Sequence, residues 1–175
     1  SGDEGGLPVD SVSLLKGAAH RRNLHESGLA SSSTTAQKWD IVSEFLEQTP
    51  YEAIGGRDAV EALADAFYDA MEREEPALTA VHRLDEEGKI HRELRRRFSL
   101  FLTLWLGGPQ DYLEEAGHPR LRRRHQQVPV DEAMRDAWLR SMKRAMDQQG
   151  IEGSVRAYLD QRFFEVADFL RNRPG

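Results

Sequence analysis

Apolar side chains recur at helical spacing along most of the chain beyond residue 50, and this pattern limits the fold more than any other feature. Between residues 57 and 73 they fall at positions i, i+3, i+4 and i+7, which places them on one face of a helix. A second such stripe runs from residue 90 to 106 and ends at the GGP of residues 107–109. No segment shows the two-residue alternation of a strand, so we expect an all-α domain. The two stripes consist of Val60, Leu63, Ala64, Phe67, Tyr68 and Met71, and of Ile90, Leu94, Phe98, Phe101, Leu102 and Trp105.

Two further helices are predicted near the C-terminus. Asp131 is a plausible N-cap for a helix that carries Met134 and Trp138 on its apolar face, and Gly150 is suited to end it. Ser154 is a candidate N-cap for a last helix before Pro174. With 175 residues in all, we expect one helical domain over residues 50–175.

The first 49 residues form a separate extension. Residues 1–34 are rich in Gly, Ser, Asp and Glu, which predicts partial disorder. Trp39, Val42, Phe45 and Leu46 recur at helical spacing, so one amphipathic helix is expected near residues 35–48. Its apolar face predicts docking on the main domain or on another subunit.

Composition excludes several classes of protein. The chain has no cysteine, which excludes disulfides, thiolate metal sites and a cysteine nucleophile. A net charge of −6 argues against a general nucleic-acid binder, and no apolar run is long enough to span a membrane. We expect a cytoplasmic protein, although a start at Ser1-Gly2 does not exclude a removed targeting segment.

A basic run that ends in a histidine is the strongest candidate site. The six histidines include no close cluster of the kind that zinc requires, but a single imidazole can hold haem iron because the porphyrin supplies the other four ligands. His125 follows RLRRR, and guanidinium groups suit the two haem propionates, with Arg97 offering a second position at the pocket rim. From the residues alone, a solvated basic face or a phosphate-binding patch explains RLRRRH equally well.

Four segments, in this order and at these separations, carry a family resemblance: FYDAM, FLTLWLGGPQDY, GHPRLRRRH and RDAWL. Together they resemble the group II truncated haemoglobins, which are shortened globins. The resemblance covers roughly residues 51–171 and is most specific in LGGPQDYLEEAGHPRLRRRH. It implies a two-over-two helical sandwich around haem b, which is iron protoporphyrin IX.

The resemblance also implies roles for individual residues. His125 becomes the proximal iron ligand, and Tyr68, Trp138 and His82 become the distal hydrogen-bond donors to a small ligand. Leu94 and Phe98 are placed over the iron, where they keep out bulk water. The expected haem contacts are His125, Arg97, Arg122, Arg124, Phe98, Leu94, Trp138 and Tyr68.

Two features depart from the family pattern. The extension before Tyr51 is foreign to it, which leaves a homodimer open, and Phe98 is bulkier than the aliphatic residue expected there, which bears on ligand access. The glycines of Gly55-Gly56 and Gly107-Gly108 match the family's helix ends, where backbone freedom permits sharp turns.

The functional expectation is a haem protein that binds oxygen for storage, delivery or scavenging. An enzyme that oxidises nitric oxide or reduces peroxide, supplied with electrons by a reductase, is the main alternative. A sensor that uses the extension to respond to ligand state is a third. Oxygen, nitric oxide, carbon monoxide and peroxide are the expected small ligands.

Overall fold

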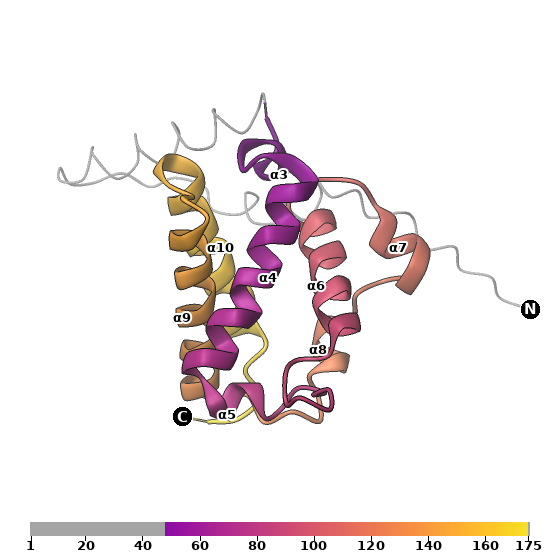
Figure 1. Ribbon diagram of the computed structural model, residues 1–175, viewed down its shortest axis with the longest axis vertical. Helices are drawn as coiled ribbons and strands as arrows, with labels where there is room; N and C mark the ends of the chain where they lie inside the picture. Colours follow the sequence, from indigo (N-terminus) through magenta and orange to yellow (C-terminus); the bar gives the residue numbers. More distant parts are fainter. Residues whose placement is uncertain (1–47, 175) are drawn as a thin grey trace, which may run out of the picture.

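The computed structural model describes residues 48–174, and within this range the ordered structure is helical (Figure 1). The elements are α3 (Pro50–Ala53), α4 (Gly56–Glu74), α5 (Pro76–Thr79), α6 (Arg92–Trp105), α7 (Asp111–Ala116), α8 (Leu121–Arg124), α9 (Glu132–Gln148) and α10 (Gly153–Phe169). In this range Leu84 and Ile90 form an isolated antiparallel bridge, outside any strand. The all-α prediction is confirmed. The helix predicted near residues 35–48 lies outside the described residues, except for Gln48.

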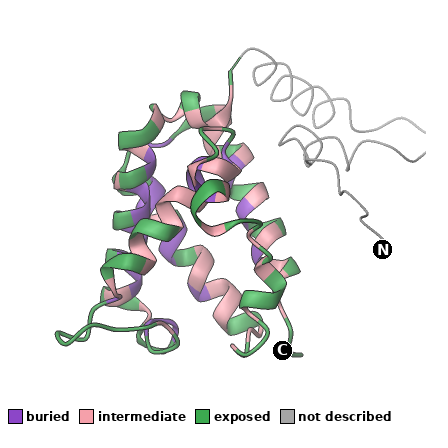
Figure 2. Ribbon diagram, turned by 90° about the vertical axis from the view of Figure 1, so that its right-hand side faces the viewer, coloured by how far each residue is buried: buried purple, intermediate pink, exposed green. Residues whose placement is uncertain are grey.

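Four long helices form two pairs. Figure 1 shows α4 and α6 running antiparallel beside each other, and α9 and α10 doing the same. α4 packs against both α6 and α9, while α10 packs against α9, so α4 is the central helix. Eight of its residues are buried, which agrees with the apolar stripe read from the sequence. Figure 2 shows buried positions on the inward faces of the helices and exposed positions on the outward faces.

The helix ends follow local sequence signals, with one correction. Asp131 caps α9 as predicted, because its side chain accepts a hydrogen bond from the Met134 backbone N–H at 2.9 Å. Ser154 is not the N-cap of α10, since that helix begins at Gly153 after Glu152. Pro50 occupies the first position of α3, where a missing N–H costs nothing.

Glycines at two junctions let the chain turn closely. Gly107 follows α6 with φ +91°, a region that only glycine enters without strain. Beside it, a Cβ added to Gly108 would come within 2.7 Å of the Tyr51 ring, so a side chain at that position would displace the ring. The backbone N–H of Tyr51 also donates to the Leu106 carbonyl at 3.0 Å. These contacts fasten the start of the domain to the end of α6.

Candidate haem pocket

A cavity of about 430 Å³ lies among the helices, and its walls are mostly apolar and aromatic. It brings together residues that are far apart in the sequence, from α4 to the segment after α10. The predicted site residues that line it are Tyr68, His82, Leu94, Arg97, Phe98, Arg124, His125 and Trp138. One cavity therefore contains both the imidazole of His125 and the proposed distal side chains.

His125 lies directly after the four-residue helix α8, as its C-cap. Its Nδ1 lies 2.8 Å from the Leu121 carbonyl oxygen, so this nitrogen carries the proton and donates it. The lone pair of a neutral imidazole is then on Nε2. A hydrogen bond from the other ring nitrogen to a backbone carbonyl is the usual way of orienting a metal-ligating histidine. The carbonyl partner of His125 is thus that of Leu121.

Asn172 holds the loop that follows His125, a role that no sequence motif indicated. Its side-chain Nδ2 donates to the carbonyl oxygens of His125 at 3.0 Å and Val128 at 2.9 Å. Its Oδ1 accepts from the Val130 backbone N–H at 3.0 Å, and its own N–H donates to the Val130 carbonyl at 2.9 Å. The segment after α10 therefore ties down the loop between α8 and α9.

Tyr68 is buried on α4 and faces the cavity. Burial raises the pKa of its hydroxyl well above the ordinary value, while the positive charge of Arg95 partly opposes this rise. The phenol therefore stays protonated and remains a donor. Arg95 lies over the ring at 5.5 Å and is held by Glu72 at 2.9 Å. Among residues 48–174 no protein acceptor lies within hydrogen-bond distance of the Tyr68 hydroxyl.

Aromatic packing fixes the neighbours of Tyr68. The Phe98 ring lies 5.4 Å from the Tyr68 ring and 4.9 Å from the Phe67 ring. Trp138, on α9, contacts the rings of Phe67 at 5.1 Å and Phe163 at 5.7 Å. Phe98 and Trp138 are therefore at once part of the core and part of the cavity wall.

His82 is turned toward the cavity, but its hydrogen bonding differs from the expectation. Its Nδ1 lies 2.8 Å from the Leu78 carbonyl oxygen, so the proton of the neutral ring is on Nδ1 and Nε2 is an acceptor. Burial lowers the pKa of His82, opposed by the Leu78 carbonyl and assisted by His125. A half-buried, neutral His82 thus offers the cavity an acceptor, where the family resemblance implied a donor.

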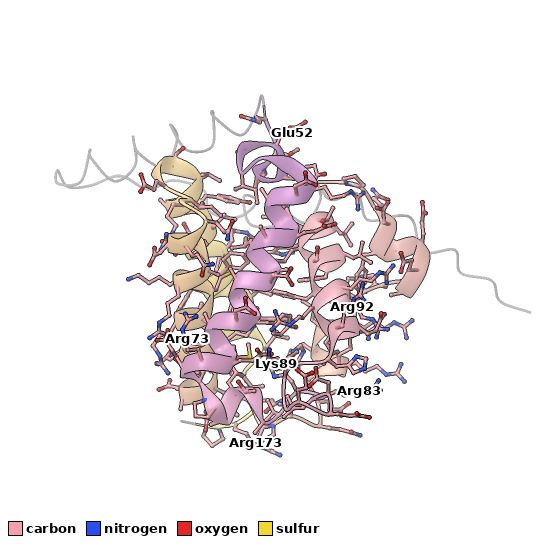
Figure 3. The ribbon with its side chains drawn as sticks, viewed as in Figure 1. Glu52, Arg73, Arg83, Lys89, Arg92 and Arg173 are labelled. Atoms are coloured by element: carbon pink, nitrogen blue, oxygen red, sulfur yellow. The ribbon has the colours of Figure 1, made fainter. Side chains whose placement is uncertain are left out.

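The cationic residues at the cavity are only partly those predicted. Arg97 and Arg124 line it, whereas Arg122 does not: its guanidinium lies over the Phe169 ring at 4.8 Å. Arg83, in the connection between α5 and α6 (Figure 3), and Arg135 also line it, and both were missed. Helical spacing could have revealed Arg135, since it stands one turn before Trp138 on α9.

The donor set fits a haem. The cavity supplies the imidazole of His125 with its Nε2 left for a metal, aromatic walls for a flat apolar ring, and guanidinium groups for carboxylates. His82 also carries its proton on Nδ1, so its Nε2 is a second nitrogen lone pair in the cavity. Across residues 48–174 no group of three or more His, Asp or Glu side chains could hold a metal ion by itself. In the same range no helix is long and apolar enough to cross a bilayer.

Comparison with known proteins decides the family. Residues 49–172 match the family model of the bacterial-like globins. This chain belongs to that family. It is 40% identical over 124 residues to the group 2 truncated hemoglobin YjbI of Bacillus subtilis, an alignment that covers 71% of this chain and 89% of the relative.

Solved structures agree with this bacterial-like globin assignment. The group II truncated hemoglobin from Bacillus anthracis matches with a TM-score of 0.67 and 38% identity, covering 73% of this chain and 99% of that one. The truncated oxygen-avid haemoglobin from Bacillus subtilis matches with a TM-score of 0.64 and 40% identity, covering 71% and 100%. The chain is a group II truncated haemoglobin of all-α, two-over-two fold, which binds haem b and oxygen as the sequence predicted.

Proposed function

We propose that this globin binds oxygen reversibly at a haem iron that His125 would hold. The hydrogen bond from His125 Nδ1 to the Leu121 carbonyl is the observation that carries the proposal. It fixes the tautomer and the ring orientation and leaves Nε2 as the metal-binding atom. When bound, the haem supplies a ferrous iron with one position free for a diatomic ligand.

The distal side chains would hold such a ligand by hydrogen bonds. The Tyr68 hydroxyl and the Trp138 indole N–H are the cavity's donors, and both lie on long helices with buried faces. Each bond contributes on the order of 1 kcal/mol, so two together would slow oxygen escape more than tenfold. His82, with its proton on Nδ1, would instead accept a hydrogen bond from a protonated ligand or a water.

The remaining lining residues would retain the cofactor and exclude water. Arg97 and Arg124 would neutralise the haem propionates, while Leu94 and Phe98 cover the ligand side. A dry distal side opposes loss of the iron's electron to oxygen. We include a reductase in this proposal, because iron that has been oxidised must be reduced before it binds oxygen again. Nitric oxide, carbon monoxide and peroxide are further ligands that a site of this chemistry would take.

Absorption spectra of His125→Ala test the axial assignment. We expect the purified variant to lose most of its haem absorbance in the ferric, ferrous and carbon monoxide-treated forms, because no other imidazole is tethered at that position. His118→Ala is the matched control, since His118 is exposed and does not line the cavity. An unchanged spectrum for His125→Ala would show that another residue holds the iron.

A further inference from the structure

A second hollow lies outside the haem pocket, where the chain passes from α7 into α8. It has a volume of about 480 Å³ and is lined by Ala116, Gly117, His118, Arg120, Arg123 and Arg124. Half of these residues are arginines. The hollow thus contains most of the basic run that the sequence left open between a haem contact, a solvated face and a phosphate site.

The arginines of this hollow lack the carboxylate partners that other arginines of the protein have. Arg120 and Arg123 form no ion pair with any residue of 48–174, and Arg124 donates through Nε to the Pro119 carbonyl oxygen at 2.9 Å. On the long helices the arginines are mostly paired, as Arg95 is with Glu72 at 2.9 Å. In a chain of net charge −6, carboxylates are abundant, yet none of those in residues 48–174 forms an ion pair with this group. Cations that line the same hollow repel one another, and a bound anion would relieve that repulsion.

The backbone of the hollow is held in an unusual conformation. Arg120 has φ +44° and is the one residue other than glycine with positive φ among those described. For a residue with a Cβ this region costs about 1 kcal/mol or more. The Arg120 backbone N–H donates to His118 Nδ1 at 3.2 Å, which stabilises the turn.

We propose that this hollow binds a phosphate-bearing anion, either free phosphate or a small phosphate ester. The planar guanidinium fork matches the spacing of phosphate oxygens and gives two parallel charge-assisted hydrogen bonds. Three arginines balance the charge of a phosphate or pyrophosphate better than that of a single carboxylate. A hollow of about 480 Å³ is large enough to hold a small phosphate-bearing molecule.

Anion binding in this hollow would be coupled to the haem pocket through one shared residue. Arg124 lines both the hollow and the haem cavity, and the next residue is His125. An anion in the hollow would compete with the haem for the Arg124 guanidinium. By linkage, anion binding would then change the affinity for haem by the same factor by which haem changes the affinity for the anion. The anion site itself does not depend on which residue holds the iron.

Isothermal titration calorimetry of the full-length, haem-loaded protein with sodium pyrophosphate, at constant ionic strength, tests the proposal. We expect one saturable site per chain and about a tenfold loss of affinity in Arg123→Gln, because a charge-assisted hydrogen bond is worth about 1.5 kcal/mol. Arg120→Gly should cause a similar loss while it relieves the positive φ, so strain cannot explain the result. Lys143→Gln, an equal loss of charge on α9 across the molecule from α7 (Figure 1), should bind as the parent does.

Titrations with other anions under the same conditions identify the class of ligand. They also define the results that would contradict the proposal. Tighter binding of adenosine monophosphate than of orthophosphate would assign a phosphate ester, and the reverse would assign free phosphate. Equal affinity for succinate would overturn the phosphate class. The absence of a saturable site, retention of affinity in both arginine variants, or an equal loss in Lys143→Gln would each overturn the site. An unchanged haem spectrum in every variant confirms that the pocket itself is intact.

Discussion

The two walls of the haem pocket are built in different ways. The distal wall rests on α4, a helix of 19 residues with eight buried side chains, and Tyr68 belongs to that buried face. The proximal wall rests on α8, which has four residues and none buried. His125 is held there by hydrogen bonds to Leu121 and by the contacts of Asn172 with the loop that follows.

Because of this difference, the distal and the proximal residues are held in place by different kinds of interaction. Close packing fixes the distal donors, because aromatic neighbours on three sides of Tyr68 leave its ring little freedom. Hydrogen bonds to backbone carbonyls fix the proximal imidazole, and these can be lost one at a time. We therefore expect core changes to affect the whole fold and proximal changes to affect haem retention.

The largest effect expected is on stability. Leu63→Ala removes a side chain that is fully buried on α4, so it should lower the free energy of unfolding by about 2–5 kcal/mol. Leu121→Ala, the matched change at a half-buried residue of α8, should lower the free energy of unfolding by less than half as much. Urea unfolding followed by far-ultraviolet circular dichroism measures both. Equal losses would mean that the proximal wall is packed as firmly as the core.

A smaller effect is expected where the C-terminal segment holds the proximal loop. Asn172→Ala removes the hydrogen bonds to His125 and Val128 and the acceptor for Val130, together worth about 1–3 kcal/mol. Haem transfer to an excess of apomyoglobin should become several-fold faster, with the helix content unchanged. Asn172→Asp sets a carboxylate oxygen against the His125 and Val128 carbonyl oxygens, so it should release haem at least as fast as Asn172→Ala. An unaltered transfer rate would show that these bonds do not retain the haem.

The smallest effect is expected for single distal donors. Tyr68→Phe and Trp138→Phe should each raise the oxygen dissociation rate about fivefold, since each removes about 1 kcal/mol of hydrogen bonding. Flash photolysis or stopped-flow mixing measures this rate. Tyr158→Phe is a suitable control because Tyr158 does not line the cavity. If neither distal variant changes the rate, the ligand is not held by these two groups.

Much of the fold and part of the site could be predicted before any coordinates were known. The apolar stripe of α4 and the Asp131 cap are local signals, and both agree with the structure. The family motifs led to the cavity-lining residues, because the motif that contains His125 is dense and distinctive. Arg122 was misplaced, since adjacent arginines on a single helical turn point in different directions and the sequence does not say which one faces inward. The reductase, the homodimer and the cytoplasmic location stay predictions.

The sequence by itself determined the helices and the family, because these depend on short-range periodicity and on a contiguous motif. The same motif carries the proposal that His125 holds the iron. The tertiary structure alone decided the pairing of Asn172 with the proximal loop, the proton position on His82, and the hollow that shares Arg124 with the haem pocket. Each of these features depends on which carbonyl groups and cationic side chains the fold brings into contact. These contacts join segments as far apart as residues 125 and 172, and no local sequence pattern predicts a contact over that separation.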